Sequence, residues 1–157
     1  MSTILTRSMN RQVSRRGIFQ KAFGPFHAGN LTVNGAWLFC ADVPYVFQGA
    51  QVVWAVASSG ACILQLTRLP SASAGGPETG FAMHEETGPD LAGTANTVAT
   101  LTPNVGTSGA INQTACLLRP GDRMGLTVDA ATTGLVGLIV VATLIPNPDF
   151  LERLSEV

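Results

Sequence analysis

From Leu31 onward the chain is a series of short apolar segments separated by turn residues. Regular short strands with turn signals between them are typical of an all-β sandwich or barrel. The composition agrees, since the 157 residues include 17 Gly and 9 Pro, which favour turns rather than a helical bundle. We therefore predict strands near residues 31–41, 44–57, 61–69, 80–86, 96–102, 111–119, 123–129 and 135–145.

One connection carries a specific turn signal. Between Leu118 and Met124 the sequence reads Arg119-Pro120-Gly121-Asp122. A type II turn is expected there, because Pro fixes φ at the first central position and Gly accepts a positive φ at the second. We predict that this turn closes a β-hairpin.

The segment 135–145 differs from the others because both of its faces are apolar. Alternation places Val136, Leu138, Val140 and Leu144 on one face, and Ile139, Val141 and Ile145 on the other. In an antiparallel sandwich one face is normally wet unless something covers it. Two explanations stay open: a central strand beneath a loop, and a strand at a subunit interface.

Charge divides the chain into two parts. The first 41 residues carry five cations and no acid, whereas the rest carries four arginines against ten acids. Opposite charge in two parts of one chain indicates an arm and a body. We predict an extended basic N-terminal arm over residues 1–30, a β-sandwich body over 31–146 and a short C-terminal helical tail over 147–157.

The predicted arm offers two kinds of binding side chain. They are the cations Arg7, Arg11, Arg15, Arg16 and Lys21, and the apolar anchors Phe19, Phe23 and Phe26. We expect the phenylalanines to press onto a protein surface, of the same chain or of a neighbour. The cations are open to three readings: contact with an acidic protein, contact with nucleic acid phosphates, or simple solvation. We favour the acidic protein, because the acidic body would repel nucleic acid.

The predicted tail starts with a helix signal. Asn147 can cap the helix and Pro148 suits its first position. So short a helix is marginal alone in water, so we expect it to dock on the body or on a neighbour. The docking candidates are Phe150, Leu151 and Leu154.

Several protein classes are disfavoured. The longest strongly apolar run, residues 134–145, is shorter than the roughly 20 residues that span a membrane. We find no apolar signal segment, so we do not expect export by a cleaved signal. Cys40, Cys62 and Cys116 are widely spaced in apolar surroundings and predict buried, reduced thiols.

Motifs for catalysis are missing from the sequence. It has no G-x-S-x-G, no phosphate-binding glycine loop and no H-E-x-x-H. The one acid–base cluster, His84-Glu85-Glu86, lies in a long Gly- and Pro-rich loop between Pro70 and Ala95. On a strand, His84 and Glu86 would face the same way, but two ligands make a weak metal site. We expect a solvated acidic loop, no cofactor and no enzyme.

Ordered pieces of the sequence resemble a known family. Residues 52–69 read as two strands around a small-residue turn. They are followed by Gly93-Thr94-Ala95-Asn96-Thr97-Val98, by Leu118-Arg119-Pro120-Gly121-Asp122-Arg123-Met124-Gly125-Leu126 and by Gly134-Leu135-Val136-Gly137. In this order and spacing, from about Val43 to Leu144, the chain resembles the capsid decoration (cement) proteins of tailed bacteriophages.

The resemblance implies a jelly-roll-like β body that assembles as a homotrimer on the outer surface of the virion's capsid, with an arm reaching over neighbouring subunits. The expected partners are the major capsid protein and other copies of the chain, without membrane, after synthesis in the host cytoplasm. The candidates for trimer or core packing are Val136, Leu138, Ile139, Val140 and Val141.

Two other function classes stay open. A head-fibre or tail-associated β-sandwich that binds a host glycan would stack sugar on Trp37 or Tyr45, because the strand pattern places Trp54 in the core. An enzyme would need a metal near His84.

Overall fold

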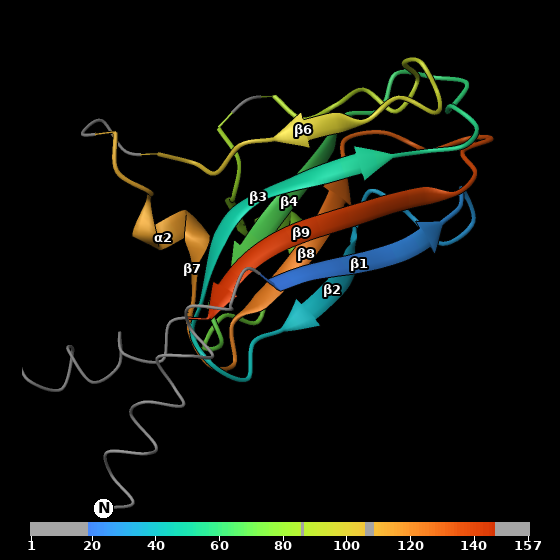
Figure 1. Cartoon of the computed structure of the whole chain (residues 1–157). Helices are drawn as coiled ribbons and strands as arrows, with labels where there is room; N and C mark the ends of the chain where they lie inside the picture. The colour runs from blue at the N-terminus through green and yellow to red at the C-terminus, as the bar shows by residue number, and fades with distance from the viewer. Residues whose placement is uncertain (1–18, 86, 106–108, 147–157) are drawn as a thin grey trace, which may run out of the picture.

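The computed structural model describes residues 19–85, 87–105 and 109–146, which form two antiparallel β-sheets packed face to face (Figure 1). Sheet A takes its strands in the order β1 (Phe19–Phe26), β9 (Leu138–Pro146), β3 (Tyr45–Val53) and β6 (Ala99–Leu101), and β7 (Leu117–Leu118) also pairs with β3. Sheet B takes the order β2 (Ala36–Cys40), β8 (Arg123–Val128), β4 (Leu64–Leu69) and β5 (Phe81–Ala82). The predicted all-β sandwich is confirmed.

The strand pairing is that of a jelly roll. With β7 set aside, the first strand pairs with the last, β2 with β8, β3 with β6, and β4 with β5. A double-sheet jelly roll arises when a long antiparallel ribbon rolls up in this way. The pairs β9–β3 and β8–β4 then complete the two sheets.

Alternating inward residues of both sheets form the core. From sheet A, Phe47, Leu138 and Leu144 are fully buried, and from sheet B, Leu64 and Leu126 meet them. Each fully buried side chain of this kind contributes about 1.5–3 kcal/mol relative to exposure. Their burial is therefore the main contribution that holds the two sheets together.

Strand β1 corrects the predicted boundary between arm and body. Residues 19–26 pair with β9, with Phe23 opposite Val140, so the part of the predicted arm from Phe19 onward belongs to the sandwich. The sequence of β1 does not show a clear alternation of apolar and polar residues, because the charged Lys21 stands at an inward position opposite Ala142. Its ammonium lies 4.2 Å from the centre of the Phe39 ring on β2, a cation–π contact that lets a charge sit at this edge of the core.

The turn at residues 119–122 has the predicted type but a different role. Gly121 has φ of +87°, and the Asp122 N–H donates to the Arg119 carbonyl at 2.9 Å. The strands on its two sides lie in different sheets, since β7 pairs with β3 and β8 pairs with β2 and β4. The predicted hairpin is therefore wrong, and the turn connects sheet A to sheet B.

Two further expectations need correction. The predicted strand 111–119 begins instead with a short helix, α2 (Gln113–Cys116), because the Asn112 side chain accepts hydrogen bonds from the N–H groups of Thr114 and Ala115. Cys40 is exposed, because it stands at an outward position of the edge strand β2, whereas the other two thiols are buried.

A loop of the chain covers part of the outer face of sheet B. It contains the 3₁₀ turn η1 (Pro77–Thr79). Thr67 Oγ1 donates to the Pro77 carbonyl at 2.8 Å, and the Arg123 guanidinium donates to the Pro70 carbonyl at 3.3 Å. The predicted helix at 147–157 lies outside the described residues. Among the described residues, no helix is long and apolar enough to cross a membrane.

Candidate functional site

The outer face of sheet A carries no charged side chain at the outward positions of β1, β9, β3 and β6. We call this surface the uncharged face. Its side chains are Gln20, Ala22, Val46, Gln51, Val53, Thr100, Ile139, Val141, Thr143 and Ile145. Not one of these ten is buried.

The strand register sets these side chains in rows across the sheet. One row runs through Ala22, Val141, Gln51 and Thr100, so that it crosses all four strands. In the next row Ile139, which is 36% exposed, stands opposite Val53. Directly opposed residues of an antiparallel pair touch on the same face, so these apolar side chains form a continuous surface.

More apolar surface is exposed just beyond the ends of β3 and β9. Val56 and Val136 form an isolated bridge there, and they are 50% and 43% exposed. Gly137, with φ of +70°, stands between Val136 and the start of β9. The uncharged face is therefore adjoined at this end by two further exposed valines.

The predicted trimer or core residues divide into three groups. Leu138 and Val140 point inward and are fully buried, Ile139 and Val141 lie on the uncharged face, and Val136 is exposed beyond the strand end. The alternation predicted for the strand therefore extends from Leu138 to Ile145 but does not include Val136.

The predicted arm residues are only partly within the described chain. Arg7, Arg11, Arg15 and Arg16 lie outside it, as do Phe150, Leu151 and Leu154 of the predicted tail. Phe23 and Phe26 are half-buried against the core of their own body. The side chain of Phe19 is not among those described, although its backbone begins β1.

Both chain ends enter the body at the same end of sheet A. Phe19 stands opposite Leu144 on β9, and Pro146 stands opposite Tyr45 on β3. Residues 1–18 and 147–157 are thus attached within a few residues of each other on neighbouring strands. Figure 1 shows the starts of β1 and β3 and the end of β9 together at this end.

A polar cluster lies beside these attachment points. The Tyr45 hydroxyl donates to Asp42 Oδ1 at 2.9 Å, and the Tyr45 ring packs edge-on against Phe39, with 5.2 Å between ring centres. The hydrogen bond from Tyr45 lowers the pKa of Asp42, and burial raises the pKa of Tyr45. Lys21 on β1 also contacts the Phe39 ring on β2. The cluster therefore connects the edges of the two sheets.

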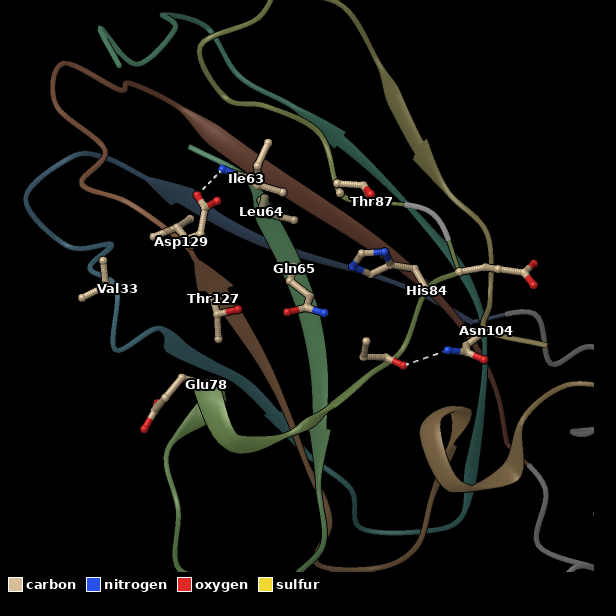
Figure 2. A pocket seen from close by; sticks show the side chains of 14 residues that line it. Val33, Ile63, Leu64, Gln65, Glu78, His84, Thr87, Asn104, Thr127 and Asp129 are labelled. Atoms are coloured by element: carbon tan, nitrogen blue, oxygen red, sulfur yellow. Dashed lines mark hydrogen bonds between the residues drawn. The ribbon is translucent and has the colours of Figure 1, made fainter. Parts of the chain in front are cut away.

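A hollow of about 540 Å³ opens on the outer side of sheet B (Figure 2). Among the described residues, its charged and imidazole side chains are Glu78, His84, Glu85 and Asp129, and no other aromatic ring lines it. His84 is 4% exposed, and its Nε2 accepts a hydrogen bond from the Leu66 N–H at 3.2 Å. Asp129 Oδ1 accepts from the Ile63 N–H at 2.6 Å.

These polar groups hold the backbone around the start and middle of β4. An Nε2 whose lone pair accepts a backbone hydrogen bond is not available to bind a metal. In the part of the chain that the structure describes, no group of three or more His, Cys, Asp or Glu side chains could hold a metal ion. Glu86, the partner considered for His84, lies outside that part.

Most of the aromatic side chains considered for sugar stacking are buried in the fold. Trp54 and Tyr45 are buried. Trp37 is 43% exposed, but the Arg123 guanidinium lies 4.8 Å from the centre of its ring. One exposed ring with a cation stacked on it is a small platform for a glycan.

Comparisons with known proteins give little similarity. No protein-family model matches the chain, and no curated protein sequence matches it. A solved structure titled "Structure of infectious bursal disease virus Gx strain" aligns with 17% sequence identity and a TM-score of 0.27, over 86% of this chain and 39% of that chain. The chain therefore spans about two fifths of that neighbour's length, and so low a TM-score does not establish a common fold.

Only the β9 part of the uncharged face is predicted from the sequence. The contribution of β3 is not, although the sequence carries a signal for it. The chain has no charged residue from Val43 to Thr67, and none from Ala130 to Pro148. These two stretches contain β3 and β9, the central strands of sheet A.

Proposed function

We propose that this protein is a structural component of a tailed-phage virion, which binds the outer surface of the capsid and stabilises the expanded head as a trimer. The observation that carries the proposal is the uncharged face. A sandwich that exposes a whole sheet without charge is built to pack against protein. The resemblance of the sequence to capsid decoration proteins supplies the partner.

The proposed binding needs no catalytic group. A protein that binds the assembled lattice and not the separate subunits stabilises the lattice by mass action. Three copies joined in a trimer strengthen the effect, because the second and third contacts become intramolecular once the first has formed.

The N-terminal segment supplies the contact with the capsid in this proposal. Residues 1–18 contain four arginines and no acid. Phe23 and Phe26 pack in the body, which leaves the arginines as the main contacts of the segment. An acidic capsid surface would attract them, and salt would screen that attraction.

Co-sedimentation with expanded heads that lack the protein tests this proposal. The full chain should saturate the heads, and a chain lacking residues 2–18 should stay folded but remain in the supernatant. The deletion stops before β1, so that sheet A stays intact. A full-length variant with Arg7, Arg11, Arg15 and Arg16 changed to Gln separates the charge of the segment from its length. This variant should bind the heads more weakly than the unmodified chain, and its binding should depend less on salt.

Two outcomes would overturn parts of the proposal. Normal binding by the shortened chain would exclude the N-terminal segment as the contact. A full chain that ignores the heads at low salt would exclude the capsid role itself.

A further inference from the structure

We infer that the uncharged face is the surface through which this chain packs against further copies of itself. The inference rests on the proposed function, because it assigns a surface to the oligomer proposed there. It extends that proposal from one strand to four, including Val46, Val53 and Gln51 on β3.

The first step is that something covers this face. The outward side of an antiparallel sandwich normally carries polar and charged residues. Here Val141 lies in the middle of the face and the pair Val53 and Ile139 at one end of it, and each of the three keeps part of its surface exposed. An exposed apolar surface of this extent marks an interaction site.

The second step concerns the charge of the partner. Nucleic acid is bound through lysine and arginine, and a strongly charged protein is recognised by opposite charges. At the outward positions of β1, β9, β3 and β6 neither sign of charge is present. The partner surface must therefore also be uncharged and partly apolar.

The third step is that a copy of this chain offers such a surface. When identical molecules associate, charges of one sign can be brought together and repel. The outer side of sheet B would bring together Glu78, Glu85 and Asp129 with their own copies. The uncharged face avoids this repulsion, and Gln20, Gln51 and Thr100 at exposed positions can hydrogen-bond across the contact.

The fourth step is the size of the face. Strands β1, β9, β3 and β6 contain 8, 9, 9 and 3 residues, and at about 3.3 Å per residue and about 4.8 Å between strands they give a projected area of roughly 450 Å². A stable interface buries about 800 Å² of accessible surface per partner. The accessible surface of the face exceeds its projected area because side chains project from it, and the exposed Val56 and Val136 add to it at one end.

The test is the mass of the full-length protein and its variants by light scattering. We expect the unmodified chain to be an oligomer. Gln51→Lys places one charge at an exposed position in the middle of the face, where it is not expected to disturb folding, and should yield monomers with an unchanged circular dichroism spectrum. Val141→Lys in the same row should have the same effect.

Gln65→Lys is the matched control, because Gln65 is an exposed outward residue of a central strand in sheet B. It should remain an oligomer. A monomeric unmodified chain, or a Gln51→Lys variant that stays oligomeric, would overturn the inference.

Head binding separates this inference from the proposed function. A monomer that saturates expanded heads would overturn the self-association surface and leave the capsid role standing. An oligomer that Gln51→Lys dissociates, but that never binds heads, would establish the surface and overturn the capsid role.

Discussion

Asp122 connects three segments of the chain from a buried position. Its carboxylate accepts hydrogen bonds from Arg68 Nε at 3.0 Å and Arg68 Nη2 at 2.6 Å, and from the N–H groups of Ser71 and Arg119 at 3.0 and 2.8 Å. The Arg68 guanidinium also donates to the Thr114 carbonyl. The buried ion pair thus holds the end of β4, the β7–β8 turn and α2 together.

Asp122→Asn should lower the free energy of unfolding by about 3–5 kcal/mol, because it leaves the buried Arg68 charge without its counter-ion. Urea denaturation followed by circular dichroism measures the change. Glu85→Gln removes an exposed carboxylate and should change stability by less than about 0.5 kcal/mol. Equal stability of the two variants would show that the pair does not hold these segments.

The three thiols should differ in reactivity. Burial raises the pKa of Cys62 and of Cys116, which disfavours the reactive thiolate, whereas Cys40 is exposed on β2. A maleimide should label one thiol per native chain and three in denaturant. Cys40→Ser should abolish native labelling, and labelling of a second native thiol would contradict the burial of the other two.

At the scale of elements, the turn between β7 and β8 depends on one glycine. Gly121 has φ of +87°, and a Cβ there would lie 3.0 Å from Ser71 Cβ. Gly121→Ala should therefore destabilise the fold by about 1–2 kcal/mol. Gly60→Ala is the control, since Gly60 has no positive φ and open space around it. Equal denaturation midpoints for the two variants would contradict the strained turn.

Some elements of the fold can be predicted from the local sequence, and others cannot. Most strands were predicted near their positions, because apolar alternation and turn residues are local signals. Strand β1 was missed because Lys21 occupies an inward position, and its partner Phe39 is distant in the chain. The type of the turn at 119–122 was predictable, but which sheets it connects depends on the pairing of β7 with β3.

The uncharged face could likewise be predicted only in part. The two apolar faces of the last strand were visible in the sequence, and they correspond to the core and the uncharged face from Leu138 to Ile145. The rows that cross from Ala22 to Thr100 depend on long-range register, which no local pattern contains. In the sequence, that surface is indicated by the charge-free stretches that contain β3 and β9.

Across the whole molecule, the two sides of the sandwich present different surfaces. Sheet A turns an uncharged face outward, whereas sheet B carries a covering loop and an acidic hollow. The basic N-terminal segment is attached at one end of sheet A, next to the attachment of the C-terminal segment. In the proposed role, copies of this body join through the uncharged face, and the N-terminal segment contacts the capsid.

The thermal stability of expanded heads is a direct measure of the proposed capsid role. Expanded heads that lack the protein should be titrated with the full chain, and the temperature at which they break open should be measured by calorimetry. We predict a rise that levels off when all sites are filled, because binding favours the assembled lattice. An unchanged temperature at every concentration would contradict a capsid-stabilising role.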